Sequence, residues 1–255
     1  MKLLTDFDGV WTDPSGEAAF IREIITGEVS RLTGEGESSI RPRLDQIRED
    51  IRRQPTEHGW EESGALSAYA DEDPYIENNA LCRAIALHHS DLWKPISREY
   101  ADFGAFGYAC YKAGAQRQAE DETALLRSEA RQLLENLLAA GWEIVFVSNS
   151  SGDKLVSCLG DLADSAGGPI RIRGSACKFV LTGGESPQTR TLAGRTVRID
   201  RDHYRTILEE ERPDVVIGDV FSLDLALPLC LREADPDLLR TGVVLMNSDD
   251  LQRMI

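Results

Sequence analysis

Short apolar runs recur along the chain, and each is followed by small or polar residues. The runs are Leu3 to Phe7, Glu143 to Val147, part of Ile170 to Val180, Val215 to Ile217, and Gly242 to Met246. Their lengths and their β-branched and aromatic residues are typical of buried strands in a parallel sheet. The pattern therefore predicts a sheet built from segments that lie far apart in the sequence.

Helical patterns separate these runs in the second half of the chain. The patterns are Glu122 to Ala140, which ends at Gly141, about Gly152 to Ala163, and Arg201 to Glu211, which ends near Pro213. Glycine and proline at these positions are ordinary helix stops. Because strands and helices alternate, we expect a doubly wound, Rossmann-like α/β core.

The first crossover is much longer than a strand-helix-strand unit needs. Asp6 and Ser148 are separated by 142 positions, whereas such a crossover requires only about a dozen or more residues. Helical patterns fill this interval at Glu17 to Leu32, Ile40 to Arg53, Pro74 to His89 and Ser97 to Ala115, with polar, glycine-containing breaks at Thr33 to Ser38 and Gly59 to Ser67. We therefore predict a mainly helical subdomain over residues 14–119, inserted into a core formed by residues 1–13 and 120–255.

Composition narrows the class of partner. Hydrophobic residues make up 42% and charged residues 28% of the chain, which is ordinary for a folded protein. The formal net charge of -16 argues against binding along a nucleic-acid backbone, which draws on clustered basic side chains. No segment has the apolar length to span a bilayer and the N-terminus lacks a signal-peptide pattern, so we expect no membrane partner and a cytoplasmic protein.

The strongest chemical signal follows the first apolar run. In Asp6-Phe7-Asp8-Gly9-Val10 both carboxylates emerge where a strand ends, and Gly9 permits a sharp exit of the chain. Two acids held two positions apart point to the same side, where one can attack or bind a metal and the other can transfer protons. An acidic turn after a strand would give the same pattern, so further residues must decide between these readings.

A second acidic segment favours a catalytic or metal-binding role for Asp6 and Asp8 over a simple acidic turn. Val215-Val216-Ile217-Gly218-Asp219 is again an apolar run that ends in an acid, and Asp224 lies five positions further on. Magnesium prefers hard oxygen ligands and keeps several waters, so a few carboxylates from different strand ends can hold it. We predict that Asp6 and Asp219 bind Mg²⁺, with Asp224 either in support or capping a helix.

A third run, Ile144 to Val147, ends in Ser148-Asn149-Ser150-Ser151 before a predicted helix. The start of a helix offers unpaired backbone N–H groups and a positive dipole end, which suit a phosphate group. We predict that Ser148, with Asn149 beside it, binds phosphoryl oxygens. Ser150 followed by Asp153 matches a capping box, so we expect Ser150 to cap the helix.

Together, the segments DFDGVWTD, VFVSNSS and VIGDVFSLD resemble the first, second and fourth motifs of the haloacid dehalogenase-like (HAD) hydrolase superfamily, in the same order. The resemblance spans most of the core and none of the inserted region. It implies that Asp6 attacks phosphorus to form an aspartyl-phosphate, and that Asp8 protonates the leaving oxygen and later activates water. It also implies that Asp6, the backbone carbonyl of Asp8 and Asp219 hold magnesium.

The third motif of this superfamily is a single basic residue, for which the sequence offers three candidates. Arg201 opens the helix before the Gly-Asp strand, Lys178 lies in or just after an earlier strand, and Arg205 is one helical turn beyond Arg201. We favour Arg201 as the catalytic basic residue and expect Lys178 to contact the substrate. Lysine is usual at this position in the superfamily, so an arginine would be a departure.

An acid such as Asp8 favours phosphate-ester cleavage over dehalogenation, because an alkoxide leaving group needs a proton and a halide does not. We therefore predict a magnesium-dependent phosphatase acting on a small phosphorylated metabolite. A phosphotransferase or phosphomutase would share the same acids, and a binding protein that keeps the fold without activity is the third alternative. The oligomeric state and the substrate cannot be predicted from these motifs.

The inserted region is expected to act as a lid over the substrate, as the inserted subdomains of the superfamily do. Its candidate contacts are Asn78, Asn79, Arg83, His88 and His89. Its aromatic residues include Tyr100, Phe103 and Tyr111, which share one helical face. We expect these three rings to pack in the core of the subdomain.

Overall fold

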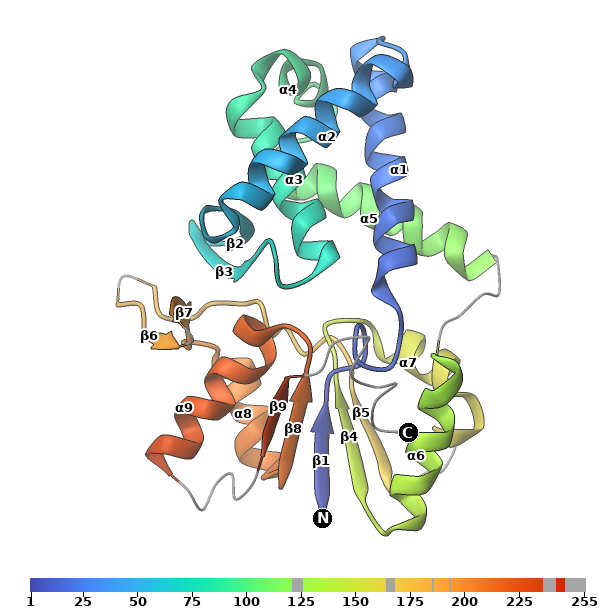
Figure 1. Cartoon of the computed structure of the whole chain (residues 1–255), viewed down its shortest axis with the longest axis vertical. Coiled ribbons are helices and arrows are strands. Elements are labelled where there is room, and N and C mark those ends of the chain that lie inside the picture. Colours follow the sequence, from blue (N-terminus) through green and yellow to red (C-terminus); the bar gives the residue numbers. More distant parts are fainter. Residues whose placement is uncertain (121–125, 164–167, 185, 193, 236–241, 246–255) are drawn as a thin grey trace. The chain divides into compact units, whose positions relative to one another are not determined.

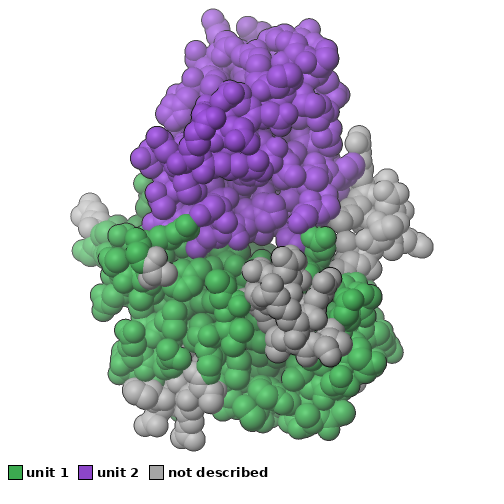
Figure 2. Space-filling model, viewed as in Figure 1, with its two compact units in different colours: residues 1–13, 62–68, 125–255 green, residues 14–61, 69–124 purple. Residues whose placement is uncertain are grey.

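A computed structural model describes residues 1–120, 126–163, 168–184, 186–192, 194–235 and 242–245. The chain divides into two compact units, which are coloured separately in Figure 2. Unit 1 comprises Met1–Asp13, Glu62–Ala68 and Leu125–Ile255, and unit 2 comprises Pro14–Glu61 and Tyr69–Ala124. Each unit is described separately below.

Unit 1 contains a five-stranded parallel sheet with the order β5-β4-β1-β8-β9. Its strands are β1 (Lys2–Thr5), β4 (Glu143–Val147), β5 (Ile170–Arg173), β8 (Val215–Gly218) and β9 (Val243–Leu245). The central strand β1 pairs with both β4 and β8, with Leu3 opposite Ile144 on one side and Val215 on the other. This order reverses direction at β1, as in doubly wound α/β folds, so the predicted fold class is confirmed.

Helices cover both faces of this sheet, as Figure 1 shows. They are α6 (Ser128–Ala139) and α7 (Gly152–Leu159) on one face, and α8 (Asp202–Glu211) and α9 (Ala226–Ala234) on the other. On the first face, Leu134 and Leu155 join a buried cluster with Ile144 and Phe146. Because alternate residues of a strand point to opposite faces, the four consecutive apolar residues of β4 after Glu143 contribute to both layers.

The segment that follows β1 is part of this core. Phe7 and Trp11 both pack edge-on against Phe146, at ring-centroid separations of 5.7 and 6.1 Å. The indole N–H of Trp11 donates to Thr5 Oγ1 at 2.8 Å, so the buried ring has its polar group satisfied. These contacts fix the path of the chain on either side of Asp8.

Unit 2 is mainly helical, as predicted. It contains α1 (Pro14–Thr33), α2 (Glu37–Arg53), the short 3₁₀ segment η1 (Pro55–Glu57), α3 (Pro74–His88), α4 (Ser90–Ile96) and α5 (Phe103–Glu120). Ile25, Leu44, Ile85 and Phe106 are among the residues of a buried cluster in this unit. Tyr100 and Tyr111 pack against the same cluster, as predicted, but Phe103 is not among its residues and Tyr100 lies in the turn before α5, so the three rings do not share a helical face.

The predicted helix from Ser97 to Ala115 is wrong at its start. Residues 97–102 form a turn between α4 and α5. Asp102 Oδ1 accepts a hydrogen bond from the backbone N–H of Ala105 at 2.7 Å, which is the N-cap arrangement that starts α5. The aspartate was the local signal for this boundary.

Two hairpins were not predicted. β2 (Gly59–Glu62) and β3 (Ala65–Tyr69) form one, joined through Ser63 and Gly64, which both have positive φ values (51° and 79°). Two such residues match the primed turns that join paired strands. The second hairpin consists of β6 (Thr189–Leu192) and β7 (Arg195–Arg198), which pair antiparallel.

The compact units differ from the predicted domains at two places. The second boundary lies between residues 124 and 125 instead of 119 and 120, and the hairpin segment Glu62–Ala68 belongs to unit 1. In unit 1, Ser67 Oγ donates to the carbonyl of Phe179 at 2.7 Å and accepts from Arg201 at 2.8 Å. Among the described residues, no helix combines the length and apolar character needed to cross a bilayer.

Candidate active site

The first acidic pair lies at the carboxyl end of the central strand. The backbone N–H of Asp6 continues the sheet by donating to Ile217 O at 2.9 Å, and Asp6 Oδ1 accepts from the N–H of Phe7 at 2.7 Å. Phe7 is fully buried and points away from the carboxylates. The alternation of this segment therefore presents Asp6 and Asp8 at one edge of the sheet, as predicted.

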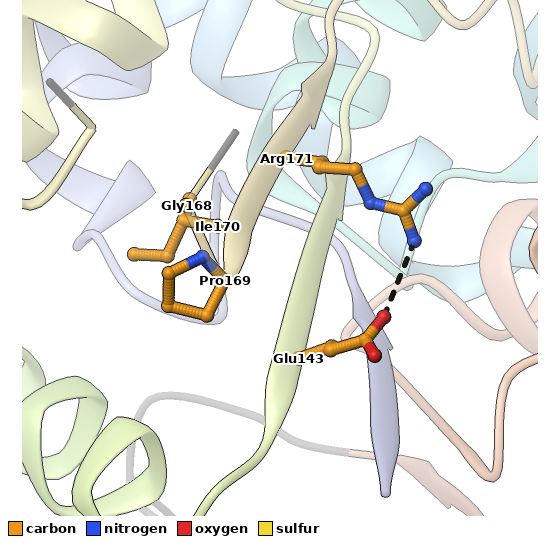
Figure 3. Close-up of a pocket in the computed structure, with 5 residues that line it drawn as sticks. All are labelled: Glu143, Gly168, Pro169, Ile170 and Arg171. Atoms are coloured by element: carbon orange, nitrogen blue, oxygen red, sulfur yellow. Dashed lines mark ion pairs between the residues drawn. The ribbon is translucent and has the colours of Figure 1, made fainter. Parts of the chain in front are cut away.

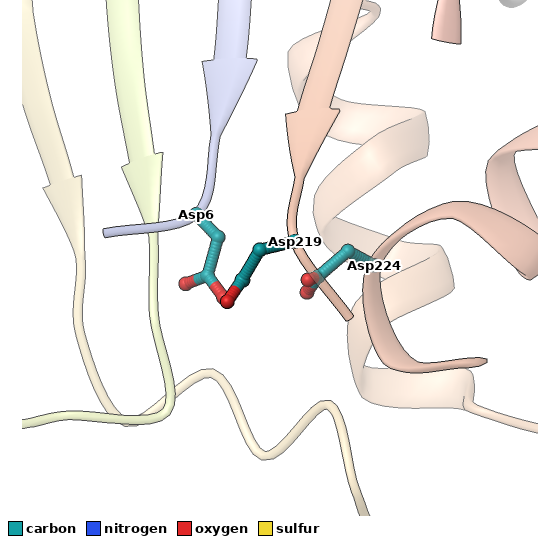
Figure 4. Close-up of side chains that lie close together, drawn as sticks. All are labelled: Asp6, Asp219 and Asp224. Carbon is teal, nitrogen blue, oxygen red and sulfur yellow. The ribbon is translucent and has the colours of Figure 1, made fainter. Parts of the chain in front are cut away.

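The second acidic pair follows the neighbouring strand β8. Figure 4 shows Asp6, Asp219 and Asp224 side by side, and one oxygen of each lies within 4.8 Å of the others. Asp224 belongs to a π-helical turn, Phe221–Leu225, which leads into α9. Its Oδ2 accepts from the N–H of Val220 at 3.0 Å, so this turn fixes the orientation of the carboxylate.

The basic residue of the site is Lys178. Its Nζ lies 3.0 Å from Asp6 Oδ2 and 2.5 Å from Asp224 Oδ1, and its side chain is only 1% exposed. Lys178 lies in the loop after β5, whose carboxyl end is at the same edge of the sheet as those of β1 and β8. A buried ammonium between two carboxylates neutralises charge that the interior would otherwise disfavour.

The preference for Arg201 as the catalytic basic residue is therefore corrected. Arg201 occupies the N-cap position of α8 and is fully buried. Its guanidinium donates to Ser67 O at 2.6 Å and to Lys178 O at 2.5 Å. The two Nη groups of the planar guanidinium donate to these two carbonyl oxygens. Arg201 therefore connects the Glu62–Ala68 hairpin segment to the loop that carries Lys178. Arg205 follows on α8 and donates its backbone N–H to Arg201 O.

Burial and charge shift the titration of this cluster. Burial raises the pKa of Asp6 to about 8, Lys178 opposes the shift, and the carboxylates of Asp224 and Asp8 add to it. Burial alone would lower the pKa of Lys178, but Asp224 and Asp6 raise it above its ordinary value. Lys178 is therefore a permanent cation, and the site needs a further positive charge to hold all its carboxylates ionised.

Asp8 faces the loop after β4. Its Oδ2 accepts from Ser150 Oγ at 2.7 Å and Ser148 Oγ at 3.2 Å, and its Oδ1 lies 2.9 Å from Lys154 Nζ. Ser148 therefore lies beside Asp8, and the contacts of Ser150 and Lys154 with Asp8 were not anticipated from the sequence. Three donors hold this carboxylate beside the loop predicted to bind phosphate.

The expected capping role of Ser150 is also corrected. Ser151 caps α7, because its Oγ accepts from the N–H of Lys154 at 3.2 Å. Ser150 is left to donate to Asp8. Asn149, expected to contact substrate, accepts the N–H of Lys178 with its Oδ1 at 2.8 Å, so it positions the lysine loop.

The residues present fit a magnesium ion. Asp6 and Asp219 offer hard oxygen ligands from adjacent strand ends, and Asp224 lies beside them, with its oxygens accepting from Lys178 and Val220. Gly9 adopts φ = 80°, and a Cβ placed there would lie 1.7 Å from Asp219 Oδ2. The turn after β1 is therefore shaped to admit the Asp219 carboxylate.

A separate pocket of about 420 Å³ lies at the opposite edge of the sheet. Its lining residues Glu143, Gly168, Pro169, Ile170 and Arg171 surround the amino ends of β4 and β5 (Figure 3). Arg171 and Glu143 form an ion pair across it at 3.7 Å. Ligands of open α/β sheets bind at the carboxyl ends of strands, so this pocket is not the candidate site.

Comparisons with known proteins give limited information. No protein-family model and no curated protein matches the chain. Among solved structures, the chain is similar to YfnB of Bacillus subtilis, named as a candidate HAD-hydrolase and solved with bound magnesium. The identity is 15%, the TM-score is 0.46, and the match covers 99% of this chain and 97% of that one. The case for the site therefore rests on the side chains described above.

Proposed function

We propose that the protein is a magnesium-dependent phosphatase of the HAD type, acting on a small phosphorylated metabolite. The observation that carries the proposal is the placement of Asp6. Its carboxylate lies beside Lys178, Asp219 and Asp224, and Asp8 follows two positions later in a separate set of contacts. Two acids in different environments suit two different roles.

In the first step, an oxygen of Asp6 attacks phosphorus and the ester oxygen departs with a proton from Asp8. In the second, Asp8 takes a proton from water, the water oxygen attacks phosphorus, and the Asp6 carboxylate is released together with phosphate. Asp6, Asp219 and the backbone carbonyl of Asp8 would hold Mg²⁺, which neutralises phosphate charge when bound. Lys178 supplies a second positive charge next to Asp6.

Two side chains are suited to orient the phosphoryl oxygens. Ser148 follows β4 directly, Lys154 lies in the first turn of α7, and both contact Asp8. The dipole of this helix adds positive potential at the same place. Lys154 thus adds a cation that the sequence motifs did not indicate, and it also holds Asp8 beside the phosphate.

The direct test is phosphate release from a panel of phosphorylated metabolites, with and without Mg²⁺, comparing the native chain with Asp6→Asn. Asparagine keeps the size of the side chain but cannot attack phosphorus. We expect Mg²⁺-dependent release that falls at least about a thousandfold in Asp6→Asn, since removal of a nucleophile is among the largest catalytic losses. Equal release from both proteins would contradict the proposal.

A phosphotransferase or phosphomutase would share the first step. Formation of the aspartyl-phosphate with phosphate transfer to an added acceptor, and little free phosphate, would move the assignment to that class. No Mg²⁺-dependent reaction with any ester would instead favour the binding-protein alternative.

A further inference from the structure

Three arginines of unit 2 gather around one buried carboxylate. Glu77 on α3 is 7% exposed, and its oxygens accept from Arg48 Nη2 at 3.0 Å and from Arg52 Nε at 2.6 Å, both on α2. Arg22 on α1 lies within electrostatic reach of all three groups. The cluster therefore places three guanidinium groups against a single buried acid.

Arg22 is the member whose charge is not balanced. Among the described residues it makes one hydrogen bond, a 3.4 Å contact from Nη1 to the neutral amide oxygen of Asn78. The nearby acids Glu77 and Glu23 are already engaged, the first as above and the second by Arg41 at 2.6 Å. Burial, followed by the charge of Arg48, lowers the pKa of Arg22.

Arg48 has a buried hydrogen-bond donor that is not satisfied within the described part of the chain. Its Nε is buried and donates to no atom of the described residues. Asp45 and Glu49 also approach this cluster, but they are 60% and 54% exposed, so solvent screens them. A buried donor without an acceptor, next to an unbalanced guanidinium, opposes folding unless something else satisfies both.

We propose that Arg22 and Arg48 form a binding site in unit 2 for a small oxyanion, a carboxylate or a phosphate group. The planar fork of a guanidinium donates two parallel hydrogen bonds to such a group. Asn78 orients Arg22, because its own amide nitrogen is fixed by a 2.9 Å bond to Ala18 O. Glu77 holds Arg48 and Arg52 in place, and the other acids that pair with these two arginines, Asp45 and Glu49, are exposed.

The same chemistry has two possible sources. The oxyanion is either an inorganic ion such as phosphate or the carboxylate of a small organic acid. The site does not depend on the proposed function.

The first experiment measures the melting temperature of the full chain over a sulfate titration, for the native protein, Arg22→Gln and the control Arg53→Gln. Arg53 is an exposed arginine of the same unit that pairs with Asp50. Glutamine at position 22 can still donate to Asn78. Sulfate bound at the candidate active site contributes equally in all three proteins, so the difference between them isolates the cluster.

We expect the native protein and Arg53→Gln to gain stability with sulfate, and Arg22→Gln to show at least about tenfold weaker dependence. Without sulfate, Arg22→Gln should melt at the same temperature as the native protein or higher, because it removes an unbalanced charge. Equal sulfate dependence in all three proteins, or none in the native protein, would overturn the proposal.

The second experiment identifies the source. It repeats the titration with phosphate and with acetate, in the native protein and in Arg22→Gln. Stabilisation that Arg22→Gln loses only with phosphate assigns the site to an inorganic ion, and stabilisation that it loses only with acetate assigns it to a carboxylate. Equal dependence of the two proteins on both anions would overturn the proposal.

Discussion

At the scale of single residues, Lys178 is the cation that pairs with two buried acids of the candidate site, Asp6 and Asp224. Lys178→Met keeps the length of the side chain and leaves Asp6 and Asp224 buried without their cation. Removing one partner of such a pair costs about 3 to 5 kcal/mol of stability. We expect this loss in chemical denaturation at pH 7, together with loss of Mg²⁺-dependent turnover.

A second change separates stability from catalysis. In Lys178→Met/Asp224→Asn the buried carboxylate of Asp224 is also removed, so we expect part of the stability to return while turnover stays absent. Arg201→Lys is the matched control, because it weakens buried contacts to Ser67 and Lys178 carbonyls without removing the cation beside Asp6. If Arg201→Lys abolished turnover and Lys178→Met did not, our correction of the basic residue would be wrong.

The raised pKa of Asp6, about 8, gives a pH dependence with a definite sign. The folded, metal-free protein holds a proton on Asp6 that the unfolded chain releases near pH 4, so this group favours folding less as pH rises from about 4 to 8. Magnesium must displace that proton. We therefore expect Mg²⁺ to raise the melting temperature more at pH 8 than at pH 6, and this difference to vanish in Asp6→Asn.

The acids of the site could be predicted from the sequence because each follows directly on an apolar strand. Asp6, Asp8, Asp219 and Ser148 need only the rule that parallel strands end at one edge. Lys178 could not be chosen in the same way, since it lies several residues beyond β5 in an irregular loop. Its partners are set by tertiary contacts such as the Asn149 bond to its backbone.

At the scale of elements, the turn after β1 controls access to the metal ligands. In Gly9→Ala the added Cβ would collide with the Asp219 carboxylate, so Asp219 must move. We expect Mg²⁺ affinity, measured by titration calorimetry, to fall by about 10- to 100-fold, the range seen when groups that orient a metal ligand are lost. Gly141→Ala is the control, because it has the same φ of 80° with nothing within 4 Å.

Both glycine variants carry the cost of a positive φ, about 1 kcal/mol. Loss of Mg²⁺ affinity in both would attribute the effect to backbone strain and not to Asp219. Unchanged Mg²⁺ affinity in Gly9→Ala would contradict the assignment of Asp219 as a Mg²⁺ ligand.

Strands and long helices were predictable because their apolar periodicity is strong. The two hairpins were not, since β2 and β6 are short and mostly polar or exposed, and Ser63-Gly64 alone is a weak turn signal. The Met246 end of the last predicted strand and the start of the Glu122 helix lie outside the described residues.

At the scale of the whole molecule, the sequence predicted a core with a helical insertion, and the structure adds a hairpin segment from within the insertion to the core unit. That segment is held by Arg201, whose neighbour in space is the Lys178 backbone. A segment of the predicted insertion therefore supports the loop that carries Lys178. No pattern of hydrophobic residues encodes such a link, because it depends on one buried guanidinium.

The central claim is that Asp6 is the nucleophile. The measurement that tests it most directly is the mass of the protein after acid quenching during turnover with Mg²⁺, followed by peptide mapping. The account predicts a transient phosphoryl group on Asp6 that is absent in Asp6→Asn. Turnover without any phosphorylated Asp6, or phosphate on another residue, would contradict it.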